Sequence, residues 1–205
     1  ELITPEDEIA LKEAFIHAKE IFEPEELVSW FTVKAEPFYR SVSWKVLLPL
    51  YEELLGIVEK KSGPESPETA SVLNGLAGIY RYMENYEESL KFFLRALKIR
   101  ENLPDQPRPE TGNTLSELGI LYTLMNRREE ALSFYTRALE IQKKFLNPKN
   151  LGAVRTLNRT AFFYKGLEKP ERAEECFMQA LKLLEKLQEQ EPDNRVVMGY
   201  RAGTL

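Results

Sequence analysis

Residues of matching type recur at a fixed interval of 42 positions through most of this chain, and this interval constrains the fold more than any other feature. No insertion or deletion interrupts it across two successive intervals. A fixed period of this length predicts a stacked array of structural repeats. The sets that share the spacing are Leu73, Leu115 and Leu157; Tyr80, Tyr122 and Tyr164; Phe93, Tyr135 and Phe177; Ala96, Ala138 and Ala180; and Leu97, Leu139 and Leu181.

Each repeat contains two helical patterns separated by a short break. In the first repeat, apolar and small residues at Leu73, Leu76, Ala77 and Tyr80 fall on one face of a helix, here named helix A. The pattern resumes after Glu84 and predicts a second helix, helix B, along Ser89, Leu90, Phe93, Ala96 and Leu97. Because the break is only a few residues long, the two helices must be antiparallel neighbours.

Small residues occupy the positions where these helices would touch. Larger side chains there would hold the helix axes beyond the usual contact distance of about 8–10 Å. An aromatic ring at the Phe93 position of each repeat is expected to fill the remaining space. The small positions are Ala77, Gly119 and Ala161 in helix A, with Ser89, Ala131 and Ala173 and also Ala96, Ala138 and Ala180 in helix B.

These residues resemble the tetratricopeptide repeats, whose units carry the pattern W-x2-L-G-x2-Y followed by A, F and A. A leucine replaces the tryptophan here, and the unit is longer than usual. The longer unit is similar to that of the kinesin light chain group, and F-Y-T-R-A-L-E-I-Q-K at 134–143 matches it closely. The resemblance covers about residues 67–187 and implies an all-α fold, a right-handed superhelix (α-solenoid) of antiparallel helix pairs. The second unit supplies Leu115, Leu118, Gly119, Tyr122, Ala131, Tyr135 and Ala138.

The remaining residues can be placed around this array. We expect a helical N-terminal cap at 1–43, a degenerate half unit at 44–66, and full units at 67–108, 109–150 and 151–192. The start of a fourth helix A is expected at 193–205. The sequence begins without methionine and stops inside this repeat, which suggests a piece of a longer protein.

Helix boundaries in the cap follow from local signals. Thr4 as N-cap and Pro5 at the first position predict a helix over residues 4–22. Pro37 is expected to end or kink the next helix near Glu36. The cap's aromatic residues suggest either a hydrophobic seal or a binding pocket for a partner. The first helix should bury Ile9, Phe15, Ile16 and Phe22, and the aromatic group comprises Trp30, Phe31, Phe38 and Trp44.

The repeat units also carry start signals. Ser66 before Pro67 predicts a capped helix start in the first full unit, and the loop at 104–111 does the same for the second. Asn150 is a candidate N-cap for the third unit.

Composition excludes several function classes. A net charge of −5 over 205 residues argues against a nucleic-acid or membrane-surface partner, and no apolar run is long enough to span a bilayer. One cysteine, Cys176, rules out an internal disulfide and suggests a reducing, cytoplasmic setting. His17 is the only histidine. With no metal-ligand spacing and no phosphate-binding glycine loop, the sequence predicts no catalytic, cofactor or metal site.

The family resemblance implies that helix A residues line a concave surface that binds partners. Their polar side chains include three cations and no carboxylate, so the predicted ligand is an extended peptide with acidic groups or a terminal carboxylate. Glu117 would oppose such a ligand, and these faces could also be merely solvated. The predicted positions are Ser71, Asn74 and Arg81; Asn113, Ser116 and Thr123; and Arg155, Asn158 and Lys165.

Three functional hypotheses remain open at this stage. The leading one is a non-catalytic scaffold for a protein or peptide partner. The second is a regulatory or sensor region of a larger enzyme, such as a protease, a kinase or a nucleotide-driven switch. The third is self-association through the C-terminal end.

Overall fold

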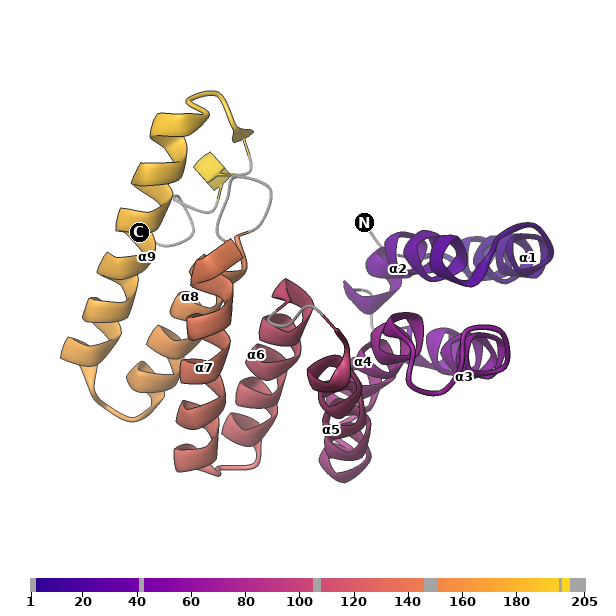
Figure 1. Ribbon diagram of the computed structural model, residues 1–205, viewed down its shortest axis with the longest axis horizontal. Helices are drawn as coiled ribbons and strands as arrows, with labels where there is room; N and C mark the ends of the chain where they lie inside the picture. Colours follow the sequence, from indigo (N-terminus) through magenta and orange to yellow (C-terminus); the bar gives the residue numbers. More distant parts are fainter. Residues whose placement is uncertain (1–2, 41–42, 105–107, 146–150, 196, 200–205) are drawn as a thin grey trace. The chain divides into compact units, whose positions relative to one another are not determined.

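The computed structural model describes residues 3–40, 43–104, 108–145, 151–195 and 197–199 of the chain, and within these ranges it contains helices and no strand. They fall into two compact units, Glu1–Pro104 and Asp105–Leu205. The helices are α1 (Pro5–Ile21), α2 (Pro24–Arg40), α3 (Trp44–Lys61), α4 (Pro67–Tyr82), α5 (Tyr86–Asn102), α6 (Pro109–Leu124), α7 (Arg128–Gln142), the short 3₁₀ helix η1 (Lys143–Phe145), α8 (Gly152–Gly166) and α9 (Pro170–Gln190) (Figure 1).

The predicted capped helix starts are confirmed at Thr4 and Ser66, whereas α6 begins at Pro109 after Arg108, whose side chain makes no cap hydrogen bond. The Thr4 hydroxyl accepts from the backbone N–H of Asp7 at 3.2 Å, and the Asp7 carboxylate accepts from the Thr4 N–H at 2.8 Å. This reciprocal pair satisfies two N–H groups that a helix start otherwise leaves unbonded. Ser66 caps α4 through its side chain, accepting from the Thr69 N–H at 3.1 Å. Asn150, the candidate cap of the third unit, lies outside the described residues.

The predicted buried stripe of α1 is partly wrong. Ile9 and Ile16 are 55% and 53% exposed, whereas Leu11, Phe15 and Ala18 are buried. Residues 11, 15 and 18 follow the i, i+4, i+7 spacing of one helix face, and the two isoleucines lie on another face. The sequence offered two competing apolar faces on this helix, and the packing against α2 and α3 uses the one that contains Leu11.

Pro37 was expected either to end or to kink its helix near Glu36, and the first of these outcomes is wrong. Helix α2 continues to Arg40 with Pro37 inside it. Proline removes the N–H that would bond to the carbonyl of Val33 four residues earlier. Because Val33 is 69% exposed, water can reach that part of the helix, which lowers the cost of the missing bond. The helix therefore tolerates the proline for one further turn.

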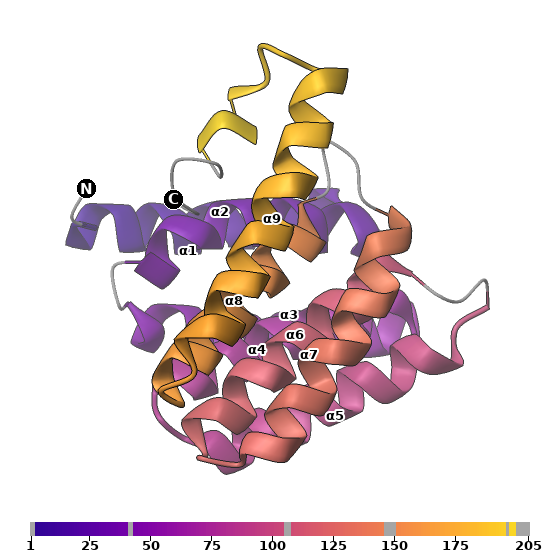
Figure 2. The ribbon, with the colours of Figure 1, turned by 90° about the vertical axis from the view of Figure 1, so that its left-hand side faces the viewer.

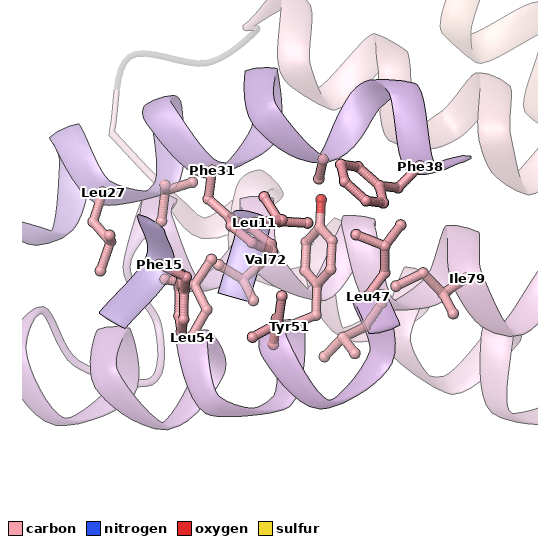
Figure 3. Packing of buried hydrophobic residues seen from close by; sticks show 14 of the residues in the cluster. Leu11, Phe15, Leu27, Phe31, Phe38, Leu47, Tyr51, Leu54, Val72 and Ile79 are labelled. Atoms are coloured by element: carbon pink, nitrogen blue, oxygen red, sulfur yellow. The ribbon is translucent and has the colours of Figure 1, made fainter. Parts of the chain in front are cut away.

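Aromatic rings from α1, α2 and α3 form the centre of the first unit's core (Figure 3). The ring of Phe31 lies 5.1 Å from that of Phe15 and 4.9 Å from that of Tyr51, centroid to centroid. The Tyr39 hydroxyl bonds to Tyr51 and donates to the carbonyl of Gly75 at 3.1 Å. This bonding links α2, α3 and α4 through buried hydroxyl groups. Burial raises the pKa of Tyr51 to about 12 and also raises that of Tyr39.

The turn between helices A and B has the same geometry in each full repeat. Glu84, Asn126 and Glu168, which are 42 residues apart, all adopt a left-handed backbone with φ of 60°, 57° and 56°. The next residue's N–H returns to a carbonyl near the end of helix A, over 2.9 Å from Asn85 to Tyr80 in the first repeat. Bonds of this kind satisfy carbonyl groups at the C-terminus of a helix.

The second unit contains two such antiparallel pairs, α6 with α7 and α8 with α9. Helices α8 and α9 lie side by side and are joined by a tight turn (Figure 1), and in the view of Figure 2 α9 passes in front of α8. The small positions predicted at the helix contacts are buried, including Ala131, Ala138, Ala161 and Ala180. A Cβ added at Gly119 would lie 2.6 Å from the ring of Tyr135, so glycine is what allows α6 and α7 to approach here.

The predicted fourth helix A falls partly outside the described residues. Residues 196 and 200–205 of the expected fourth helix A lie outside the described ranges. Val197, which the structure does describe, is buried in the cluster that includes Leu187 of α9. None of the described helices is both long enough and apolar enough to cross a membrane.

Candidate functional site

The second unit places most of its predicted binding residues at least partly on the surface. Arg155 and Lys165 on α8 are exposed, and Asn113 on α6 and Asn158 on α8 are half-buried. Helices α6 and α8 are the two A helices of this unit, and they are in contact. Two cations and two amides therefore share one pair of adjacent helices.

Ser116 differs from the other predicted residues because it is only 1% exposed. Its hydroxyl oxygen accepts from the Arg159 guanidinium at 2.9 Å and lies 3.0 Å from the hydroxyl oxygen of Thr156. These bonds join α6 to α8. Ser116 therefore contributes to packing between the A helices, and we leave it out of the set proposed to contact a ligand.

Glu117, expected to oppose an acidic ligand, is paired with a cation. The Arg159 guanidinium donates to the Glu117 carboxylate at 2.8 Å, and the two side chains are 33% and 20% exposed. The pairing offsets the carboxylate's charge locally, although a pair this exposed contributes little to stability. Glu117 therefore does not present an unpaired carboxylate beside the exposed cations of α8.

A buried glutamine that sequence reasoning missed completes the arrangement. Gln142, at the end of α7, is 2% exposed; its amide donates to the Asn113 side-chain oxygen at 3.1 Å and accepts from the Thr156 hydroxyl at 2.7 Å. Its repeat equivalents are Arg100 and Leu184, 42 residues to either side. Polar residues at a position that is otherwise helix-B core are the signal that could have identified it.

The first unit arranges its predicted residues differently. The Ser71 hydroxyl donates to the Pro67 carbonyl at 3.0 Å and accepts from the Arg100 guanidinium at 3.4 Å. The guanidinium of Arg81 lies over the ring of Tyr82, 4.4 Å from its centroid. Ser71, Asn74 and Arg81 are all half-buried on α4. Arg81 is thus partly immobilised by a cation–π contact, and Ser71 already makes two hydrogen bonds.

Tyr82 also belongs to a small aromatic group in the first unit. Its ring is stacked on that of Trp44, with centroids 4.8 Å apart and planes 8° apart, and Tyr39 lies beside both. Trp44 was among the predicted cap aromatics, and Phe31 and Phe38 of that group are buried in the core. The buried members therefore act in packing, while Tyr82 remains 48% exposed.

The lone thiol lies in an environment that suppresses its reactivity. Cys176 is 9% exposed and packs against Ala161 and Ala173. Burial is the main cause that raises the pKa of the thiol, and the neighbouring Glu175 carboxylate raises it further. A raised pKa leaves less thiolate, which is the reactive form. Among the described residues, no cluster of histidine, cysteine or acidic side chains could hold a metal ion.

Comparison with known proteins identifies the family. A tetratricopeptide repeat family model matches three overlapping segments, residues 44–102, 68–144 and 110–186, which together span well over half of the chain. The chain belongs to the tetratricopeptide repeat family. Repeats of this family generally serve as scaffolds for protein–protein interaction, and the fold is typically non-catalytic. No curated protein matches the chain significantly.

Solved structures of similar fold include kinesin light chain-like proteins. BtubC (BKLC) from P. vanneervenii has a TM-score of 0.68 at 22% identity, covering 84% of this chain and 70% of that chain. A putative kinesin light chain of Podosopora anserina, with nearly identical TPR-like repeats, has a TM-score of 0.65 at 16% identity and coverages of 90% and 97%. At these identities the likeness shows the fold alone.

A third similar structure contains ligands. Bacillus thuringiensis PlcR, in complex with the peptide PapR7 and DNA, has a TM-score of 0.69 at 18% identity. The match covers 97% of this chain and 69% of that chain. The predicted tetratricopeptide fold of the kinesin light chain-like type is thus confirmed.

Proposed function

We propose that this protein is a non-catalytic interaction module that binds an extended, acidic peptide segment of a partner protein along its A helices. In the second unit the contact set is Asn113, Arg155, Asn158 and Lys165. In the first unit it is Asn74 and Arg81. Ser71 is left out of this set because its hydroxyl already makes two hydrogen bonds within the protein. The proposal also places the protein in the cytoplasm, where a single reduced thiol is the usual state.

One observation carries the proposal more than any other. Arg155 and Lys165 are exposed on a single A helix, and the carboxylate at Glu117, on the neighbouring A helix, is already paired with Arg159. Asparagine can donate and accept at once, which suits the backbone of an extended peptide. Cations beside such amides favour a peptide that carries carboxylates. The peptide present in the PlcR structure is an analogy for ligand type and not for the residues used.

The test begins with peptides selected from a displayed library of random sequences against the wild-type chain. The affinity of a selected peptide is then measured for wild type and for the double variant Arg155→Glu/Lys165→Glu. The matched control, Lys182→Glu/Lys186→Glu, makes the same change in net charge on exposed residues of helix B. We expect the A-helix variant to weaken binding at least tenfold and the control to change it less than twofold, because close charge reversal acts locally.

Two outcomes contradict the proposal. Equal weakening by both variants would show that only net charge matters. Unchanged affinity in the A-helix variant would move the binding surface elsewhere, for example to the half-exposed aromatic group around Tyr82. A melting temperature within a few degrees of wild type in each variant excludes unfolding as the cause.

A further inference from the structure

The buried amide of Gln142 lies at the centre of a chain of hydrogen bonds that ends at a half-buried residue of the proposed binding face. The chain runs from Arg159 on α8 through Ser116 and Thr156 to Gln142 on α7, and then to Asn113 on α6. Its three central members are each at most 2% exposed, so water cannot easily substitute for their bonds. The order of donors and acceptors along this chain therefore affects which groups of Asn113, its last member, are used in the interior.

Elementary chemistry sets the direction of donation. A guanidinium can only donate, so Arg159 donates to the Ser116 oxygen. An amide oxygen can only accept, so the single hydroxyl hydrogen of Thr156 goes to Gln142. The Thr156 hydroxyl also lies 3.0 Å from the Ser116 oxygen, and its one hydrogen can serve only one of these two acceptors at a time. Reversing the Gln142 amide would turn its oxygen toward the Asn113 oxygen, so the bond between these two residues would be lost unless Asn113 reversed as well.

Glycine at position 112 allows this geometry. A Cβ added at Gly112 would lie 2.6 Å from the Cγ of Gln142 and 3.4 Å from the carbonyl oxygen of Ala138. The glutamine side chain therefore passes over the bare backbone of α6 on its way to Asn113. The equivalent positions in the other repeats are Ala70 and Val154, which pair in the repeat pattern with Arg100 and Leu184.

We infer that Gln142 is a positioning residue that determines what Asn113 presents to a ligand. Because Gln142 donates to the Asn113 oxygen, that oxygen is directed to the interior and the Asn113 NH₂ group is left to donate outward. This position then reads a hydrogen-bond acceptor, such as a main-chain carbonyl or a carboxylate of an acidic peptide. Arg155, the repeat equivalent of Asn113, is also purely a donor. The inference rests on the proposed function for the ligand, but the orientation of Asn113 can be tested without one.

The first experiment measures hydrogen exchange of side-chain amide groups by NMR in the wild-type chain. We expect the Gln142 NH₂ to be protected at least a hundredfold relative to Asn113, whose NH₂ should exchange near the rate of a free asparagine. A protected Asn113 NH₂ would overturn the inference, because it would mean that this group points inward. The Gln142→Leu variant, which takes the residue found at position 184, should abolish any fixed orientation of Asn113.

The second experiment measures the affinity of a peptide selected on the wild-type chain. Gln142→Leu should weaken binding about three- to tenfold, the effect of one ordered hydrogen bond, while Gln179→Leu at an exposed glutamine of α9 should not. Equal affinity for wild type and Gln142→Leu would contradict the positioning role. Failure to select any peptide would contradict the proposed function, and the exchange measurement would still decide the orientation of Asn113.

Discussion

The ring of Tyr51 on α3 lies so close to the Cα of Gly75 on α4 that a Cβ added there would overlap the ring. Tyr51 is 3% exposed and is bonded to Tyr39, which in turn donates to the Gly75 carbonyl. The ring therefore cannot swing away without breaking this bonding. Gly75 is the place where α4 approaches the aromatic core of the first unit, and a larger residue cannot replace it without moving one of the two helices.

Substituting Gly75 by alanine should destabilise the protein by about 1–3 kcal/mol, because the methyl group overpacks a fixed ring. Gly78, one turn along the same helix, is the matched control, since a Cβ there would meet nothing within 4 Å. Gly78→Ala should stabilise by about 0.5–1 kcal/mol through helix propensity. Chemical denaturation of both variants checks the pair. A similar effect from both substitutions would show that the close approach is not real.

The left-handed turn residues offer a second prediction. Glu84 and Glu168 adopt φ values of 60° and 56°, and the backbone of residues other than glycine or asparagine is strained in this region. Glu84→Gly and Glu168→Gly should each stabilise by about 0.5–1 kcal/mol in thermal unfolding, because relief of the strain outweighs the added freedom of the unfolded chain. Asn126→Gly should change stability less, since asparagine already tolerates this conformation. Destabilisation by either glutamate substitution would contradict the turn geometry.

Alkaline pH should reveal the burial of Tyr51. Its pKa is about 12 in the folded protein against about 10 in an unfolded chain, so folding favours the neutral phenol. The resulting stability is fully present below pH 10 and is lost as the pH rises from 10 to 12. Tyr51→Phe cannot ionise, and it should be about 1 kcal/mol less stable than wild type at pH 8 through loss of the hydrogen bond. This difference should shrink between pH 10 and 12 in urea titrations. A constant difference would contradict the buried position.

The thiol of Cys176 should react slowly with a disulfide reagent in the folded protein. Burial and the Glu175 carboxylate raise its pKa, so the reactive thiolate is scarce near neutral pH and the sulfur is also covered. We expect labelling at pH 7.5 to be on the order of tenfold slower, or more, than in denaturant, and to accelerate as the pH rises. Rapid labelling of the folded chain would place the thiol on the surface.

The repeat pattern predicted the helix pairs well because the same packing contacts recur in each repeat and require similar residue types at equivalent positions. Small residues such as Ala138 and the aromatic ring of Tyr135 are buried at their predicted contacts. The N-terminal cap was predicted less well because its sequence is not repeated in the chain, so no second copy indicated which face of α1 is buried. The division into a cap at 1–43 and repeat units from residue 44 stays a prediction.

The candidate site could be predicted from the sequence only in part. The positions on helix A followed from the family's geometry, but Ser116 lies in the interior because Thr156 and Arg159 of the next A helix bond to it. The contribution of Gln142 depends on side-chain contacts among three helices, and such contacts are not encoded in the spacing of one helix. Pairing of Glu117 with Arg159 likewise depends on which rotamers the neighbouring helices allow.

Mapping where a selected peptide binds would test the central claim most directly. A library-selected peptide is titrated into the isotopically labelled chain, and amide shifts are followed residue by residue. We predict that the largest shifts in the second unit fall on α6 and α8, around Asn113, Arg155 and Lys165, with little change on the outer residues of α9 such as Met178 and Lys182. Shifts concentrated on α9, or confined to the aromatic group around Tyr82, would contradict the assignment of binding to the A helices.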